Sequence, residues 1–218
     1  MSIRILLADD HRIVREGLRS LLEKQPGMEV IAEAENGRTT VALTRKLKPD
    51  VVIMDITMPD LNGIEATRQI ISELPDVKVI ALSMHSVRKL VVEILSAGAS
   101  GYLLKHSAFE ELGEALHTVI NNQTYLSPKI AGIVVEHYVR HPTPQGDTSV
   151  SSILTVRERE ILQLLAEGNS TRQIASSLYV SVSTIESHRK KIMDKLCFHS
   201  IAELTKYAIR EGLTSLDT

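Results

Sequence analysis

The sequence is poor in cysteine and has no long apolar run. Its one cysteine, Cys197, excludes an internal disulfide bond and fits a reducing compartment. No apolar run approaches the roughly 20 residues that a membrane-spanning helix needs. Residues 3–8 already form a strand pattern, so we expect no signal peptide before them. We therefore expect a cytoplasmic protein with no membrane partner.

The chain also lacks internal repeats, long low-complexity tracts and a strong charge of either sign. Its net charge of −2 argues against non-specific binding to nucleic acid through charge alone. No G-x-x-x-x-G-K-[ST] loop is present to indicate a nucleotide enzyme. With 218 residues, 43% of them hydrophobic, the chain is long enough for two domains with real cores.

The first 121 residues alternate strand and helix patterns five times. The strand patterns cover residues 3–8, 29–34, 51–55, 77–82 and 101–104. Apolar residues at helical spacing follow each strand, with the later helices expected over about 63–73, 87–97 and 108–121. This alternation with short connections predicts an α/β domain with a doubly wound, five-stranded parallel sheet over residues 1–121.

Polar side chains end four of these strands: Asp9 and Asp10, Asp55, Ser83, and Lys105. The carboxyl ends of parallel strands share one edge of a sheet, so these groups converge. Singly, Asp10 or Ser83 could cap the following helix, and Lys105 could be a solvated surface lysine. Together they form an acidic cluster that is costly without a cation. Carboxylates without histidine or thiolate partners suit Mg²⁺.

The strand-end residues in their motifs, with Asp55 in MDITMPDLNG, Ser83 in ALSMHS and Lys105 in AGASGYLLK, resemble a bacterial response-regulator receiver domain. The resemblance covers residues 3 to about 121 and implies a flavodoxin-like fold. It implies that Asp55 accepts a phosphoryl group from the phosphohistidine of a sensor histidine kinase. It also implies a bound Mg²⁺, held by Asp9, Asp10, Asp55 and the backbone carbonyl of Thr57.

The same resemblance gives roles to three further residues. Lys105 and the Ser83 hydroxyl would contact oxygens of the attached phosphoryl group. Tyr102 matches the switch aromatic that turns inward as Ser83 moves, while an ordinary half-buried strand aromatic is the alternative. His106 departs from the family, because many receivers have a cis proline after the lysine, and this leaves the Lys105–His106 peptide open.

Residues 122–152 connect the two halves of the chain. Ser127-Pro128 fits an N-cap followed by a first helical position, which predicts a helix near 127–140. The stretch 141–152 contains two prolines, a glycine and several hydroxyl residues. We expect it to be a flexible linker.

Residues 153–218 carry only helical patterns. Four residues mark helix starts: Thr155, Ser170, Ser181 and Ser200. Two short helices joined by a tight turn at 179–180, inside a compact bundle, form a helix-turn-helix. The sequence therefore predicts a small, all-α, four-helix domain.

The third of these helices presents polar and basic residues away from the core. Such a run is often only a solvated face, but after the turn of a helix-turn-helix it favours contact with double-stranded DNA. The candidate DNA-binding residues are Thr184, Glu186, Ser187, His188, Lys190 and Lys191.

The block from 154 to 196 is similar to the DNA-binding domain of LuxR-type regulators, over about 150–213. Glu186 departs from that family, since a lysine commonly fills its place, so operator preference should not be borrowed from relatives. Cys197 replaces a common glycine, and we expect it to be a small buried residue.

Receiver, linker and LuxR-type domain together resemble a two-component response regulator of the NarL/FixJ type, which is not an enzyme. Phosphorylation of Asp55 would then bias a two-state equilibrium that frees or pairs the DNA-binding domains. A homodimer on an inverted-repeat operator is expected, because one small, nearly neutral module offers few phosphate contacts. RNA polymerase is a further partner compatible with this type.

Two alternatives stay open at this point. One is a phosphatase or phosphotransferase with an aspartate nucleophile, although hydrolases of the haloacid dehalogenase type have a D-x-D-x pattern after the first strand, where this chain has Asp-Asp-His. The other is a LuxR-type DNA-binding regulator whose receiver-like domain is controlled by a ligand or partner rather than by phosphate.

Overall fold

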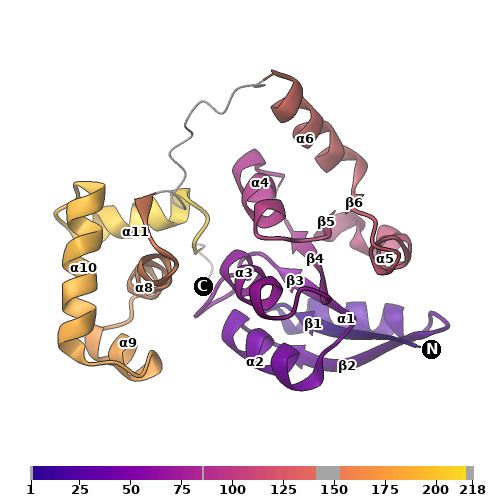
Figure 1. Ribbon diagram of the computed structural model, residues 1–218, viewed down its shortest axis with the longest axis horizontal. Coiled ribbons are helices and arrows are strands. Elements are labelled where there is room, and N and C mark those ends of the chain that lie inside the picture. Colours follow the sequence, from indigo (N-terminus) through magenta and orange to yellow (C-terminus); the bar gives the residue numbers. More distant parts are fainter. Residues whose placement is uncertain (1, 85, 141–152, 215–218) are drawn as a thin grey trace. The chain divides into compact units, whose positions relative to one another are not determined.

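The computed structural model describes residues 2–84, 86–140 and 153–214 (Figure 1). The chain divides into two compact units, Met1–Thr143 and Pro144–Thr218. The expected flexible linker at 141–152 lies outside the described residues. Among the helices that the structure describes, none is long and apolar enough to cross a membrane.

A parallel sheet forms the centre of the first unit. Its strands are β1 (Ile3–Ala8), β2 (Met28–Ala34), β3 (Val51–Asp55), β4 (Lys78–Ser83), β5 (Gly101–Leu104) and β6 (Tyr125–Leu126). Their order is β2-β1-β3-β4-β5-β6, and every neighbouring pair is parallel. The predicted parallel α/β fold is confirmed, but the predicted number of strands was one short. A two-residue strand is too short to show a periodic pattern.

Helices cover both faces of this sheet (Figure 1). They are α1 (Arg12–Leu22), α2 (Gly37–Leu47), α3 (Gly63–Glu73), α4 (Arg88–Ser96), α5 (Lys105–Ile120) and α6 (Pro128–Arg140). Alternate residues along β1 separate the two faces. Ile5 and Leu7 pack in one core with α1 and α5, whereas Leu6 and Ala8 pack in another with α2 and α3. All five residues of β3 are buried, as its continuous apolar run predicts.

A third cluster joins α4 and α6 to the sheet. It contains Tyr102 on β5, Leu90 and Ile94 on α4, and Ile130 on α6. Ile130 is completely buried. The helix expected near 127–140 is therefore present as α6 and belongs to the first unit.

Helix α5 begins earlier than its sequence suggests. It starts at Lys105, directly after β5, and not near residue 108. Leu104 precedes it without a capping side chain, so no start signal marks this position. All described peptide bonds are trans, and the Lys105–His106 bond is one of them.

The second unit is a helical bundle of α8 (Val156–Ala166), α9 (Thr171–Ser177), α10 (Val182–Leu196) and α11 (Ile201–Arg210). Each helix begins after its predicted cap, and three of the caps form complete capping boxes. One continuous apolar core joins the four helices. Helices α9 and α10 are joined at Tyr179, which has a left-handed backbone with φ 54°. The predicted all-α helix-turn-helix is confirmed.

Candidate functional site

A buried cluster of charged groups lies at the carboxyl end of the central strands. Asp9 follows β1, Asp55 ends β3 and Lys105 follows β5. The Lys105 ammonium lies 2.6 Å from Asp9 Oδ2 and 2.8 Å from Asp55 Oδ2, and its side chain is only 9% exposed. Lys105 is therefore not the solvated surface lysine that it could have been by itself.

Histidine enters this cluster beside the predicted carboxylates. Asp9, Asp10, His11 and Asp55 each offer a ligand atom, and these atoms all lie within 4.8 Å of one another. His11 Nδ1 lies 2.8 Å from Asp10 Oδ1. The reading of Asp10 as a helix cap is wrong, because His11 occupies the N-cap of α1 and makes no side-chain capping bond. Sequence reasoning missed His11, since it treated the site as made of carboxylates alone.

Burial perturbs the acid–base behaviour of Asp55. Desolvation and the nearby charge of Asp9 raise the pKa of Asp55 to about 7, against the opposing charge of Lys105 and a hydrogen bond from the Thr57 N–H. Burial by itself would lower the pKa of Lys105, but the charges of Asp55 and Asp9 raise it. The carboxylates thus outweigh the ammonium in charge, and a bound cation would relieve the imbalance. This acidic cluster is consistent with a metal site.

Arg15 is a buried part of the site that sequence reasoning missed. Its Nη1 donates to the Asp9 carbonyl oxygen at 2.7 Å, and its other guanidinium nitrogens contact Glu33 and Glu35 on the β2 side. The available signal was an arginine on the apolar stripe of the first helix, three residues before the buried Leu18.

The loop after β3 is tightly held against the ends of two helices. The Gly63 N–H donates to the Ile56 carbonyl at 2.8 Å, and a Cβ at Gly63 would lie 2.0 Å from the Asp55 carbonyl oxygen. The Gly37 N–H donates to the Leu61 carbonyl at 3.1 Å. Thr57 lies within this loop, two residues beyond Asp55. Glycine at these helix starts allows the close approach that positions the loop.

Ser83 and Tyr102 meet beside the charged cluster. Tyr102 is completely buried, so it is not a half-buried strand aromatic. Burial raises the pKa of Tyr102, and a hydrogen bond with the Ser83 side chain acts in the opposite direction. Ser83 is also buried and does not cap α4, whose N-cap is Val87.

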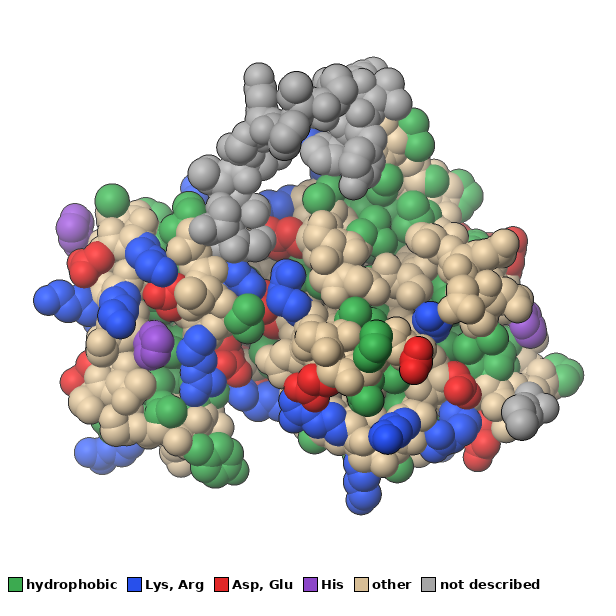
Figure 2. All heavy atoms as spheres, in the orientation of Figure 1, with side chains coloured by type: hydrophobic (Ala, Val, Ile, Leu, Met, Phe, Trp, Pro, Cys, Tyr) green, Lys and Arg blue, Asp and Glu red, His purple; other side chains and the backbone are tan. Residues whose placement is uncertain are grey.

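Most of the candidate DNA-binding residues lie on the exposed face of α10: Thr184, Glu186, Ser187, Lys190 and Lys191. His188 differs, since it is half-buried and its Nδ1 has no hydrogen-bond partner in the part of the chain that the structure describes. Figure 2 shows basic and acidic side chains interspersed on the visible surface, as the small net charge suggests.

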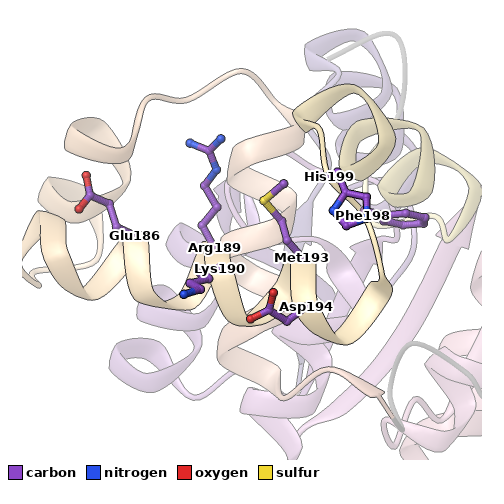
Figure 3. A pocket seen from close by; sticks show the side chains of 7 residues that line it. All are labelled: Glu186, Arg189, Lys190, Met193, Asp194, Phe198 and His199. Atoms are coloured by element: carbon purple, nitrogen blue, oxygen red, sulfur yellow. The ribbon is translucent and has the colours of Figure 1, made fainter.

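A shallow groove of about 340 Å³ runs along one side of α10 (Figure 3). Its lining residues are Glu186, Arg189, Lys190, Met193, Asp194, Phe198 and His199. Cys197 follows α10 with a left-handed backbone, φ 55°. It is exposed, so the expectation of a buried cysteine was wrong. A left-handed backbone directly after a helix is a conformation that favours glycine.

Two protein-family models match the chain. The response regulator receiver domain matches residues 5–117, and the model of bacterial regulatory proteins of the luxR family matches residues 152–208.

Full-length relatives resemble the chain over both units. The transcriptional regulatory protein DegU of Brevibacillus brevis is 37% identical over 96% of this chain and 94% of its own length. The response regulator UvrY of Escherichia coli K12 is 37% identical over 99% of this chain and 98% of its own length. The transcriptional regulatory protein LiaR of Bacillus subtilis is 39% identical, covering 98% and 100%.

Solved structures agree with these relatives. A LuxR-family response regulator from Aurantimonas is 40% identical, with a TM-score of 0.61 over 64% of this chain and 99% of that chain. The response regulator RcsB in complex with DNA is 27% identical, with a TM-score of 0.58 over 95% of this chain and 98% of that chain. These matches exclude the phosphatase alternative. The chain belongs to the two-component response regulators of the NarL/FixJ type, DNA-binding transcription regulators that join a receiver domain to a LuxR-type DNA-binding domain.

Proposed function

We propose that this regulator is switched by phosphorylation of Asp55, with the phosphohistidine of a sensor histidine kinase as donor. The observation that carries the proposal is the buried Asp55 carboxylate at the end of β3, which shares the Lys105 ammonium with the carboxylate of Asp9. We further propose that the protein acts in the cytoplasm, where the phosphohistidine of the kinase and the DNA are both accessible.

The donor set fits Mg²⁺. Two buried carboxylates and a third beside them provide hard oxygen ligands with an excess of negative charge. We assign the ion to Asp9, Asp10, Asp55 and the backbone carbonyl of Thr57. When bound there, Mg²⁺ would neutralise charge on the phosphoryl oxygens and on the carboxylate that receives them.

Asp55, Lys105 and Asp9 have different roles in the proposed phosphoryl transfer. An Asp55 carboxylate oxygen forms a bond to phosphorus while the bond from phosphorus to the kinase histidine nitrogen breaks. The Lys105 ammonium, already 2.8 Å from Asp55, moves its contact to a phosphoryl oxygen and offsets the added charge. Neighbouring Asp9 keeps the ammonium close to the site before transfer.

The switch follows from competition for one hydroxyl. Ser83 interacts with Tyr102, and an oxygen of the new phosphoryl group offers the Ser83 hydroxyl a charged acceptor instead. Tyr102 belongs to the apolar cluster that contains Leu90 of α4 and Ile130 of α6. A change at Ser83 therefore reaches α6, the last described helix before the DNA-binding unit in the sequence.

We assign DNA binding to the exposed face of α10, through Thr184, Glu186, Ser187, Lys190 and Lys191. His188 is less suited to reach a base edge because it is half-buried. The protein should bind its operator as a homodimer, since one module offers few phosphate contacts. A solved structure of two RcsB dimers on two parallel DNAs supports this assembly for a protein 26% identical to the chain.

The test is the intact mass after incubation with acetyl phosphate, with and without Mg²⁺, for the wild type and for Asp55→Asn. We expect a gain of one phosphoryl group that requires both Mg²⁺ and Asp55. No adduct under any condition would overturn the phosphorylation switch and favour control by a ligand or partner. DNA binding before and after phosphorylation then tests the readout.

A further inference from the structure

Glu186 is an unusual residue on a helix that is to approach DNA. It is exposed on the N-terminal half of α10, between the hydroxyls of the first turn and the cations that follow. Within the described residues, Glu186 makes no ion pair or hydrogen bond through its side chain. Figure 3 shows its carboxylate at one end of the groove, apart from the Arg189 guanidinium.

The surroundings of a carboxylate at this place restrict what it can bind. DNA brings phosphates on both sides of the groove, so a carboxylate is repelled unless it faces a hydrogen-bond donor. The major groove offers only two kinds of donor, the N4 amine of cytosine and the N6 amine of adenine. A carboxylate only accepts hydrogen bonds. It therefore matches cytosine better than adenine, because the adenine amine lies beside the N7 acceptor, which repels a carboxylate.

The neighbouring cations are placed to hold the helix while Glu186 meets a base. Lys190 lies one helical turn beyond Glu186 and is exposed. Arg189 is half-buried beside the same groove, and its guanidinium has no ion-pair or hydrogen-bond partner in the described parts of the chain. An unpaired guanidinium on the side of such a helix suits a backbone phosphate, because phosphate contacts set the position of the protein and base contacts set specificity.

We propose that Glu186 accepts a hydrogen bond from the N4 amine of a cytosine in each operator half-site, and so determines the base that is read there. Arg189 anchors an adjacent phosphate without regard to sequence. This assignment rests on the proposed function of α10 as the helix that enters the major groove. It gives the operator of this chain a base preference that relatives with lysine at this position do not share.

The test is selection of binding sites from a pool of random double-stranded DNA by the full chain, with and without acetyl phosphate. Wild type is compared with Glu186→Gln, Glu186→Lys and Arg189→Gln, and the three substitutions lie at exposed or half-buried positions. We expect wild type to prefer cytosine about 10-fold at one position of each half-site. Glu186→Lys should change that preference to guanine and Glu186→Gln to adenine, with the rest of the site unchanged.

Arg189→Gln is the matched control. It should select the same sequence as wild type, bind every sequence more weakly, and reduce the slope of log affinity against log salt by about 1. If the Glu186 variants select the same base as wild type at every position, the assignment of Glu186 is overturned, while DNA binding by the protein stands. If wild type enriches no sequence under either condition, the proposed operator binding itself fails.

Discussion

The Lys105 ammonium lies 2.8 Å from Asp55 Oδ2, although the two residues are 50 positions apart in the sequence. The same ammonium lies 2.6 Å from Asp9 Oδ2. One cation therefore bridges two of the three carboxylates that we assign to the metal. If Mg²⁺ binds at these carboxylates as we propose, Lys105 would compete with it for their oxygens before transfer, and both would offset the charge of the phosphoryl group during transfer.

Replacing Lys105 by methionine should separate these two effects. The Mg²⁺ affinity should rise about 10-fold, because the competing ammonium is gone. The rate of phosphorylation by acetyl phosphate should fall about 100-fold, because a charge that stabilises the phosphoryl group is lost. Calorimetric Mg²⁺ titration and time-resolved intact mass measure the two quantities. Lys24→Met, at an exposed position on the same unit, is the control. A weaker Mg²⁺ affinity in Lys105→Met would contradict the competition.

The raised pKa of Asp55 predicts a pH dependence of folding stability in Mg²⁺-free buffer. Because the pKa is about 7 in the folded protein and near 3.8 in the unfolded chain, the folded state binds more protons between these values. The contribution of Asp55 to the free energy of unfolding should therefore fall as the pH rises from 4 to 7. Asp55→Asn removes the charge and should be more stable than wild type above pH 7, by on the order of 2 kcal/mol, with the difference vanishing toward pH 4.

Urea unfolding followed by circular dichroism measures this difference, since the chain has no tryptophan for fluorescence. Asp76→Asn, which removes an exposed carboxylate from the same unit, is the control. Added Mg²⁺ should stabilise the wild type more than Asp55→Asn. A constant difference between Asp55→Asn and wild type across the pH range would mean that Asp55 is not the titrating group.

The convergence of Asp9, Asp55, Ser83 and Lys105 could be predicted from the sequence because it depends only on topology. Strands of a parallel sheet end at one edge, so each strand-end residue is placed as soon as the strands are recognised. The capping boxes of the second unit could be predicted for a similar reason, since both partners lie three residues apart.

Features that depend on distant partners or on backbone conformation could not be predicted in this way. Arg15 is held at the site because Glu33 on β2 and Glu35 just after β2 meet its guanidinium. The start of α5 at Lys105 has no local signal, because Leu104 provides no cap. Cys197 is exposed and has a left-handed backbone after α10, and composition reveals neither feature.

A substitution at Gly63 tests how closely the start of α3 is packed against the backbone of Asp55. In Gly63→Ala the new Cβ would lie 2.0 Å from the Asp55 carbonyl oxygen, so α3 or the end of β3 must move. We expect a loss of about 3 kcal/mol in the free energy of unfolding and slower phosphorylation of Asp55. Gly132→Ala, where a Cβ meets nothing within 4 Å, is the matched control in α6. It should stabilise the protein by about 0.5–1 kcal/mol. Equal stability for both variants would contradict the steric coupling.

The left-handed backbone of Cys197 lets us expect that glycine at this position stabilises the protein. It ends α10 with φ 55°, and the following Phe198 N–H donates to the Met193 carbonyl at 3.0 Å, as in helix ends that favour glycine. A left-handed conformation costs a residue with a Cβ about 1–2 kcal/mol, and glycine avoids this cost. Glycine also raises the conformational entropy of the unfolded chain, which cancels part of the stabilisation. Cys197→Gly should therefore raise the free energy of unfolding by about 0.5–1 kcal/mol, measured by urea unfolding. Cys197→Ala is the control, because it removes the thiol and keeps the Cβ. It should leave the free energy of unfolding near that of wild type. An equal gain in both variants would mean that the sulfur, and not the left-handed backbone, destabilises the wild type.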